Sequence, residues 1–211
     1  MTHIAVIDYG MGNLHSVAKA LEHAGQITSD KNVKISVSAD PQVIRSADKI
    51  LLPGVGAMRD CMGEMQRLEL VEVIKESTKN KPFLGICIGM QALMNHSQEN
   101  NGVKCLDIIP GSVEHFSPSE LKIPHMGWNQ VNQTIKHPMW NDIKQDQRFY
   151  FVHSYYVLPE QKTPIAASSH YGLSFTAALV QNNIFAVQFH PEKSADAGLQ
   201  FFANFIDWDG E

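Results

Sequence analysis

The sequence has few cysteines, no excess of basic residues and no long apolar run. Three cysteines, at positions 61, 87 and 105, are too few for a disulfide-stabilised scaffold of this size, and their odd number leaves a free thiol. The 17 Lys and Arg residues are outnumbered by 22 Asp and Glu, and the resulting net charge of −5 argues against general nucleic-acid binding. No apolar stretch reaches the length of about 18 residues that a membrane-spanning helix needs, so we expect no membrane partner.

The N-terminus also lacks the features of a secretory leader. Residues 1–8 have neither a basic start nor a long apolar stretch, which together with the cysteine count predicts a cytoplasmic protein. No linker rich in Pro, Gly or Ser divides the 211 residues, so we expect one domain over 1–211. This length is short of the ~250 residues of a complete (β/α)₈ barrel.

Hydrophobic periodicity predicts an α/β protein whose two halves differ in their pattern of secondary structure. In the first half, expected strands alternate with expected helices, which indicates βαβ units and a parallel sheet. The strands are predicted at 4–7, 33–37, 50–52 and 83–86, and the helices at 14–23 (with Gly25 as its C-cap), 62–75 and 89–95. The second half predicts an antiparallel extension or mixed sheet, with a final helix at 195–208 and strands at 113–116, 128–131, 149–157, 165–169, 176–180 and 184–189.

Cys87 lies in the sequence Gly85-Ile86-Cys87-Ile88-Gly89, between an apolar strand and a helical pattern. This is the arrangement of a nucleophile elbow, in which a sharp strand-to-helix turn leaves no room for side chains beside the nucleophile. The start of a helix also favours a thiolate, because free N–H groups there stabilise negative charge. The alternative is a buried structural cysteine with two glycines nearby by chance.

His190 and Glu192 follow an apolar strand in the sequence His190-Pro191-Glu192. In extended geometry residues two apart point to the same side, so the imidazole and the carboxylate can lie together. A carboxylate beside an imidazole fixes its tautomer and stabilises its cation, as in catalytic triads. An ordinary turn would be the better interpretation of this segment alone, but the cysteine elbow upstream favours a Cys-His-Glu triad.

A glycine-rich segment, Pro53-Gly54-Val55-Gly56, follows the strand predicted at 50–52. Acyl transfer at Cys87 needs two N–H donors for the oxyanion. We expect one from Ile88, directly after the nucleophile, and the other from Gly54 or Val55.

Two other kinds of site are not supported, and we expect neither a cofactor nor a metal. The segment Gly10-Met11-Gly12 follows a strand, but His15 stands where a dinucleotide-binding fingerprint has its third glycine. The ten histidines form no His-x-x-x-His motif, and no Cys-x-x-Cys motif occurs.

These motifs resemble the class I glutamine amidotransferases, and within them the glutaminase subunits of imidazole glycerol phosphate synthase. The resemblance covers essentially the whole chain and rests on residues 8–14, 52–56, 85–91, 124–129, 151–156 and 188–194. The connection 28–38, which looks long, and the polar segment 101–107, which contains Cys105, depart from the expected pattern without touching these motifs.

The resemblance implies a three-layer, flavodoxin-like α/β sandwich with a mixed, mainly parallel central sheet. It implies that Cys87, His190 and Glu192 hydrolyse glutamine to glutamate and ammonia. Glutamine contacts are expected from the side chain of Gln91 and from the backbones of Gly56, Ser154 and Tyr155.

The resemblance also implies a separate (β/α)₈ cyclase subunit as partner in a heterodimer. That subunit would use the ammonia to make imidazole glycerol phosphate and an aminoimidazole carboxamide ribotide in histidine biosynthesis. Low activity alone and stimulation by the partner with its nucleotide ligand are expected. The expected docking residues are Gly10, Asn13, Pro124, His125, Met126 and Trp128, although His125 and Trp128 are equally compatible with core positions.

Three alternatives remain at this point. One is another cysteine hydrolase of the same fold, such as a peptidase, an amidase or a γ-glutamyl hydrolase. The second is a paralogous amidotransferase that supplies a different synthase. The third is a non-enzymatic interaction module, which the presence of all three triad residues disfavours.

Overall fold

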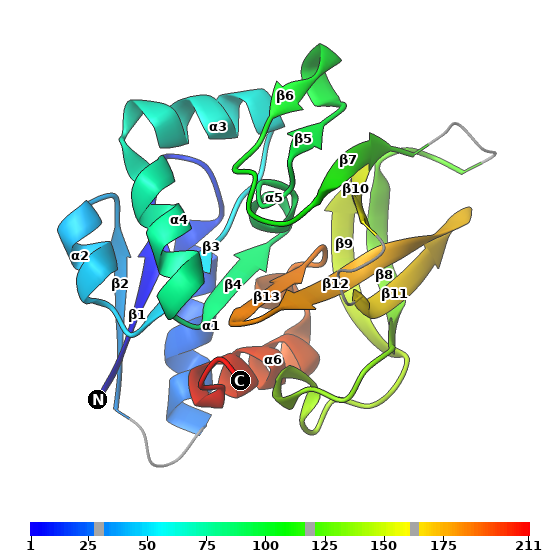
Figure 1. Cartoon of the computed structure of the whole chain (residues 1–211). Helices are drawn as coiled ribbons and strands as arrows, with labels where there is room; N and C mark the ends of the chain where they lie inside the picture. The colour runs from blue at the N-terminus through cyan, green and yellow to red at the C-terminus, as the bar shows by residue number, and fades with distance from the viewer. Residues whose placement is uncertain (28–31, 117–120, 161–164) are drawn as a thin grey trace.

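A computed structural model of the chain describes residues 1–27, 32–116, 121–160 and 165–211. Its main feature is a sheet in the order β2-β1-β3-β4-β13-β12-β11-β8-β9 (Figure 1). The first five of these strands are parallel to one another: β2 (Val33–Ser38), β1 (Thr2–Ile7), β3 (Lys49–Leu52), β4 (Phe83–Ile86) and β13 (Ile184–Val187). Their order is that of the flavodoxin-like fold, in which ligands bind beyond the carboxyl ends of the strands.

Four antiparallel strands extend this sheet on the side of β13. They are β12 (Leu173–Gln181), β11 (Ile165–Tyr171), β8 (His125–Gln133) and β9 (Gln147–His153). A second, smaller sheet has the order β10-β7-β5-β6, with β10 (Tyr155–Pro159), β7 (Gly111–His115), β5 (His96–Ser97) and β6 (Val103–Lys104). The α/β class and the mixed sheet predicted from the sequence are confirmed.

Helices cover both faces of the parallel half of the sheet (Figure 1). On one face α1 (Leu14–Ile27) packs against α6 (Ala195–Asp207). The other face carries α2 (Pro41–Ser46), α3 (Met58–Arg67) and α4 (Leu70–Asn80). Strands β3, β4 and β13 are buried along their whole length, as expected for parallel strands covered on both sides.

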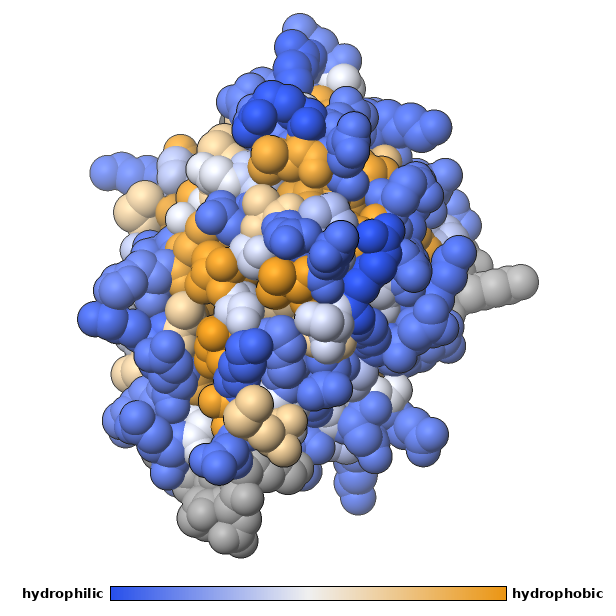
Figure 2. Space-filling view, turned by 90° about the vertical axis from the view of Figure 1, so that its left-hand side faces the viewer, coloured by the Kyte–Doolittle hydropathy of each residue, from blue (hydrophilic) through white to orange (hydrophobic). Residues whose placement is uncertain are grey.

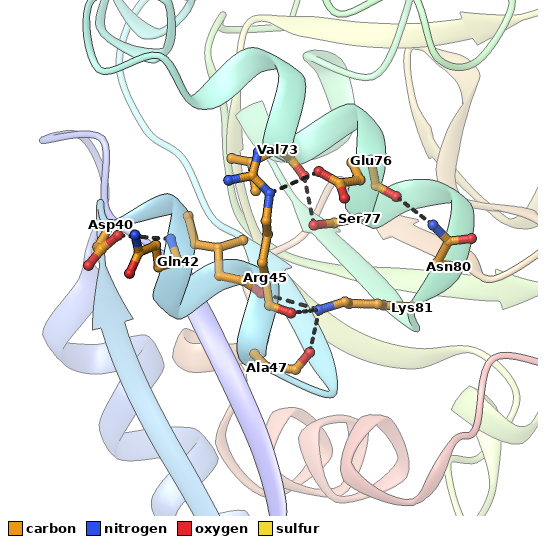
Figure 3. Close-up of polar contacts among 10 residues, drawn as sticks. Asp40, Gln42, Arg45, Ala47, Val73, Glu76, Ser77, Asn80 and Lys81 are labelled. Atoms are coloured by element: carbon orange, nitrogen blue, oxygen red, sulfur yellow. Dashed lines mark hydrogen bonds and ion pairs between the residues drawn. The ribbon is translucent and has the colours of Figure 1, made fainter.

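Lys81, at the C-terminal end of α4, ties α2 to the segment that leads into β4 (Figure 3). Its ammonium group donates to the carbonyls of Ile44, Arg45 and Ala47 at the C-terminal end of α2, at 3.3, 2.6 and 2.6 Å. The last carbonyls of a helix lack the usual partners within the helix, and this lysine supplies a donor to three of them, although the Ile44 carbonyl also accepts from the Ala47 N–H. An ion pair of 3.0 Å between Arg45 and Glu76 joins α2 to α4.

The edge strand β2 lies on the face shown in Figure 2, where hydrophobic residues form a band between hydrophilic ones. Val37 on this strand is 42% exposed, and Lys34, which points to the other face of the sheet, is the other exposed residue of the strand. A charged side chain on an edge strand discourages pairing with another chain.

Four predicted elements differ in the structure. Helix α1 continues through Gly25, where a Cβ would approach Val33 Cγ2 to 3.2 Å, so this glycine permits close packing on β2 instead of capping the helix. The helix predicted at 62–75 is two helices, because Glu69 adopts a left-handed conformation with φ 57°. The helix predicted at 89–95 is a single turn, α5 (Ile88–Gln91). The run 149–157 divides at Ser154 into β9 and β10, which belong to different sheets.

The two segments expected to depart from the usual pattern have separate outcomes. Of the connection 28–38, residues 28–31 lie outside the described residues, and 33–38 form β2. The polar segment 101–107 begins at the last residue of a 3₁₀ turn, η1 (Glu99–Asn101), and includes β6. Two further 3₁₀ turns are η2 (Pro138–Trp140) and η3 (Pro191–Lys193).

Candidate active site

Cys87 stands at the sharp turn between β4 and α5. Its φ and ψ are 54° and −107°, a conformation that non-glycine residues rarely adopt and that costs about 1–3 kcal/mol. Its backbone carbonyl accepts hydrogen bonds from the N–H groups of Met90 and Gln91, at 3.0 and 3.1 Å. The sharp strand-to-helix turn predicted around Cys87 is therefore present, and its backbone strain lies at Cys87.

The two glycines of the elbow are needed because backbone atoms lie where their side chains would be. A Cβ on Gly89 would overlap the carbonyl oxygen of Leu52, and one on Gly85 would come within 2.9 Å of the Gly89 carbonyl oxygen. The close approach of β4, α5 and the end of β3 is what excludes a larger residue. It also brings the glycine-rich segment after β3 next to Cys87.

His190 and Glu192 lie at the end of β13 and form a buried ion pair. Nδ1 of His190 is 2.8 Å from Oε1 of Glu192, and each side chain is only 2% exposed. The position of the ring is also fixed through the backbone, because the His190 N–H donates to the Tyr150 carbonyl and Ser194 Oγ donates to the His190 carbonyl. Among the described residues Nε2 of His190 has no hydrogen-bond partner.

Two opposing effects act on the pKa of His190. Burial lowers it, whereas electrostatic and hydrogen-bond interactions with Cys87 and Glu192 raise it, and the net result is a pKa of about 10. The imidazolium is therefore the form present beside Cys87 at neutral pH. Such a pair of a cysteine and a charged imidazole is the arrangement that nucleophilic catalysis by cysteine requires.

A pocket of about 260 Å³ opens at the carboxyl ends of the strands, and both Cys87 and His190 line it. Its wall includes most of the residues expected to bind the oxyanion and the substrate, namely Val55, Ile88, Gly56, Gln91, Ser154 and Tyr155. Gly54 and Glu192 do not line the pocket: Gly54 packs directly behind Ile88, and Glu192 lies behind His190.

Two buried side chains hold the segment Pro53–Val55 in place. The Tyr9 hydroxyl donates to the Pro53 carbonyl at 2.8 Å, and the Cys61 thiol donates to the Val55 carbonyl at 3.5 Å. Burial raises the pKa of Tyr9 well above its usual value and that of Cys61 to about 11, so both groups keep the proton that they donate. Ile88 is the first residue of α5, so its N–H has no acceptor within that helix.

A hydrogen-bonded chain of amide groups runs from the pocket wall to Cys87. The Gln91 amide nitrogen donates to the Tyr155 carbonyl at 3.1 Å and to Gln188 Oε1 at 3.0 Å. The Gln188 amide in turn donates to Cys87 Sγ at 3.5 Å. The Gln91 Oε1 atom is buried and has no partner among the described residues, which leaves an acceptor in the pocket wall for a donor group of a ligand.

Comparison with known proteins identifies the family to which this site belongs. Residues 5–208 match the family described as "Glutamine amidotransferase class-I". The chain belongs to this family. The family and the glutaminase activity expected from the motifs are thereby confirmed.

Curated relatives in the same family are similar over almost their full length. "Imidazole glycerol phosphate synthase subunit HisH" of Acinetobacter baylyi is 57% identical, over 99% of this chain and 99% of its own. The protein of the same name from Hydrogenovibrio crunogenus is 55% identical, over 99% of this chain and 97% of its own. Within the glutamine amidotransferases the chain therefore groups with the HisH subunits.

Solved structures agree on the fold. A structure titled "Crystal structure of glutamine amidotransferase" is 13% identical with a TM-score of 0.73, covering 97% of this chain and 99% of its own. A glutamine amidotransferase from Thermotoga maritima is 16% identical with a TM-score of 0.63, covering 98% of this chain and 83% of its own.

The expected docking residues of this amidotransferase do not all lie on its surface. Met126 and Trp128 on β8 are 61% and 50% exposed, and Pro124 lies at the rim of the pocket. His125 is only 3% exposed and points inward, so a docked partner cannot touch its side chain. Gly10 and Asn13 lie in the loop between β1 and α1 and are exposed and partly exposed.

Three residues of the site were not singled out from the sequence. Glu99 lines the pocket and accepts from the Met58 N–H at the start of α3 at 2.8 Å, but nothing in its polar surroundings marks it. His153 also lines the pocket, and Gln188 contacts Cys87. The last two lie inside motifs that carry the family resemblance, which is the one signal that could have identified them.

The described residues also bear on two other kinds of site. Residues 1–27, 32–116, 121–160 and 165–211 contain no cluster of three or more His, Cys, Asp or Glu side chains arranged to hold a metal ion. Over the same ranges, no helix has both the length and the apolar character to cross a membrane.

Proposed function

We propose that this chain is the glutaminase subunit of an imidazole glycerol phosphate synthase, and that Cys87, His190 and Glu192 are its catalytic triad. The observation that carries the proposal is the arrangement of one pocket. Cys87 stands on a strained turn, His190 is charged beside it, and Glu192 is hydrogen-bonded behind His190. We further propose that residues 1–211 form one glutaminase domain.

In the first step, the Cys87 thiolate attacks the side-chain amide carbon of glutamine. The carbonyl oxygen becomes an oxyanion, which the N–H of Ile88 and one from Gly54 or Val55 stabilise. His190 then donates its Nε2 proton to the amide nitrogen as the carbon–nitrogen bond breaks. Ammonia leaves, and a γ-glutamyl thioester remains on Cys87.

In the second step, water hydrolyses the thioester with His190 as the base. The negative charge of Cys87 is one of the effects that raise the pKa of His190, and it is absent in the thioester. In the thioester, burial lowers the pKa of His190 and only Glu192 raises it. The pKa of His190 is therefore lower than in the free enzyme, and the neutral imidazole that acts as a base is easier to form. His190 takes a proton from the attacking water, and glutamate leaves as the thiolate re-forms.

Glutamine itself is positioned by polar groups of the pocket wall. The free acceptor of Gln91 suits an N–H donor of the substrate, and the backbones of Gly56, Ser154 and Tyr155 line the remainder. The Glu99 carboxylate at the rim suits the α-ammonium group of an amino acid. A pocket of about 260 Å³ fits a single amino acid better than a peptide, which disfavours a peptidase of the same fold.

The acceptor of the ammonia lies on another polypeptide in this proposal. Relatives of the chain are named as synthase subunits, and the partner implied is the (β/α)₈ cyclase that makes imidazole glycerol phosphate and an aminoimidazole carboxamide ribotide in histidine biosynthesis. The exposed Met126 and Trp128, with Pro124 at the pocket rim, form the proposed docking surface, because large exposed apolar side chains are typical interface anchors. A cytoplasmic location fits a nucleophile that must stay a free thiol.

The experiment is an assay of ammonia release from glutamine by the chain alone, with the cyclase subunit, and with the cyclase and its nucleotide ligand. We expect low activity alone, stimulation by the liganded cyclase, and loss of binding by at least about 30-fold in Trp128→Ala. Val37→Ala on the opposite edge of the sheet is the control and should bind normally.

Full activity alone without cyclase binding would contradict the synthase role while leaving the triad intact. Stimulation by a different synthase would favour the paralogous amidotransferase. Hydrolysis of other amides or of peptides in preference to glutamine would favour another cysteine hydrolase of this fold.

A further inference from the structure

A buried pair of histidines lies between the β8 surface and the glutamine pocket. His125 on β8 and His153 on β9 are directly opposite each other, and Nδ1 of His125 is 2.9 Å from Nε2 of His153. Neither residue has a role in the mechanism above. Their rings lie among aromatic side chains, with His125 stacked on Tyr171 at 4.1 Å and on Phe151 at 5.1 Å between ring centroids.

The hydrogen bonds at both ends of the pair have only one possible direction. At the inner end, Nδ1 of His153 is 2.8 Å from the Tyr155 carbonyl, which can only accept. At the outer end, the Asn129 amide donates to the His170 carbonyl at 2.8 Å, so its nitrogen is the atom that faces Nε2 of His125 at 3.2 Å. An amide nitrogen can only donate, so Nε2 of His125 must accept.

These constraints fix the proton on each ring. His153 carries its proton on Nδ1, where it donates to the Tyr155 carbonyl, so its Nε2 is free to accept. His125 therefore donates from Nδ1 to His153 and accepts on Nε2 from Asn129. A second proton on either ring would place two donors face to face, which means that the relay exists only when both histidines are neutral. Burial lowers the pKa of His125 to about 4 and that of His153 to about 3, in agreement with this geometry.

The inner end of the relay sets the orientation of a substrate-binding group. The Tyr155 carbonyl accepts from both His153 and the Gln91 amide. Because a carbonyl cannot face the Gln91 oxygen, it holds the Gln91 amide with the nitrogen toward Tyr155 and the unpartnered Oε1 elsewhere in the pocket wall. The second Gln91 proton goes to Gln188, which contacts Cys87.

We propose that His125 and His153 are positioning residues for glutamine, which act as a one-way hydrogen-bond relay that holds the Tyr155 carbonyl and the Gln91 amide in their binding orientation. The proposal rests on the glutaminase function proposed above. It assigns a role to His125 different from the docking contact expected from the sequence. Neither histidine touches the reacting atoms.

The test compares two substitutions at each histidine in the complex with the cyclase subunit. An Asn side chain keeps a donor near the place of Nδ1, whereas Leu removes the donor at similar size. We expect His153→Leu to raise KM for glutamine by about tenfold or more, the fold-change that corresponds to about 1.4 kcal/mol, with a smaller change in kcat. His153→Asn should stay within about threefold of the wild-type KM. His125→Leu should likewise raise the KM for glutamine more than His125→Asn does, with both changes smaller than at His153. If His153→Leu does not fold, the two His125 variants decide the question.

A spectroscopic measurement tests the direction of the relay independently of activity. Nitrogen NMR of histidine-labelled enzyme should find both His125 and His153 neutral and protonated on Nδ1 at neutral pH. A charged ring, or a proton on Nε2 of either residue, would overturn the proposal. So would folded Leu variants that lose thermal stability but keep the wild-type KM, because a purely structural role predicts that result.

The failure of this inference and the failure of the proposed function are distinguishable. If wild-type enzyme hydrolyses glutamine and Cys87→Ala does not, the proposed function stands whatever the KM of the histidine variants. If Cys87→Ala retains activity, the proposed function fails, and the tautomers measured by NMR still decide whether the relay is present.

Discussion

His190 and Glu192 are joined by a hydrogen bond of 2.8 Å between Nδ1 and Oε1, and both side chains are almost completely buried. Since Nδ1 is engaged by the carboxylate, Nε2 is the nitrogen left to exchange a proton with the reacting groups. Glu192 thus fixes the ring and its charge without lining the pocket itself.

This arrangement predicts unequal effects of substitution in the two residues. Glu192→Gln keeps an oxygen that can accept from Nδ1 but removes the charge, whereas His190→Ala removes the proton carrier itself. We therefore expect kcat for glutamine hydrolysis to be about 10- to 100-fold higher in Glu192→Gln than in His190→Ala, with both below the wild-type value. Steady-state kinetics of both variants at saturating glutamine checks this. Equal losses would mean that Glu192 does more than orient and charge the imidazole.

The packing at the elbow predicts a contrast between two glycines. Gly89→Ala places a Cβ on the Leu52 carbonyl, so we expect a loss of thermal stability and of glutaminase activity together. Gly63→Ala is the matched control, because Gly63 lies within α3 with nothing within 4 Å of its added Cβ. That substitution should leave activity unchanged and raise the free energy of unfolding by up to about 1 kcal/mol. Wild-type stability and activity in Gly89→Ala would contradict the close contact between Gly89 and the Leu52 carbonyl.

The parallel half of the fold, and the proximity of Cys87, His190 and Glu192, could be predicted from the sequence. Strands buried on both sides leave continuous apolar runs, and the glycines of the elbow and the His-Pro-Glu segment follow those runs directly. The break between α3 and α4 could not be predicted, because the left-handed residue at the break is Glu69 and not the glycine or proline that usually marks the end of a helix in a sequence. The helical pattern simply continues across it.

The relay residues were unpredictable for a different reason. His125 and His153 become neighbours only through the register of β8 with β9, which depends on pairing between distant segments. Burial alternates along β8, where His125 is buried and Met126 and Trp128 are exposed, as in an antiparallel strand with one solvated face. The sequence predicts the strand only at 128–131, so His125 lies outside the predicted alternation and is expected at the docking surface instead.

The neutral histidine pair predicts that the protein loses stability in acid. Burial lowers the pKa of His153 to about 3 and of His125 to about 4, whereas in the unfolded chain each takes up a proton near its ordinary pKa of 6.5. Between these values the unfolded state binds more protons, so each histidine lowers the free energy of unfolding by up to about 1.4 kcal/mol for each unit that the pH falls below about 6.5.

His190 acts in a different pH range. Its pKa is raised to about 10, so the stability that it contributes is complete below about pH 6.5 and is lost as the pH rises toward 10. Urea unfolding between about pH 7 and pH 4.5 therefore reports on the His125–His153 pair together with His137 and His3, whose pKa burial also lowers, and comparison with a variant of the pair separates its share. The slope should be smaller in His125→Leu, and a wild-type stability that is constant over this range would contradict the burial of neutral histidines.

Covalent catalysis by Cys87 is tested most directly by looking for the thioester. Enzyme in complex with the cyclase subunit is mixed with glutamine, quenched in acid during turnover and digested, and the peptides are analysed by mass spectrometry while ammonia release is measured in parallel. We predict a glutamyl adduct on the peptide that contains Cys87, and in Cys87→Ala neither the adduct nor ammonia release above about 10⁻⁴ of the wild-type rate. Ammonia release by folded Cys87→Ala at close to the wild-type rate would contradict the account.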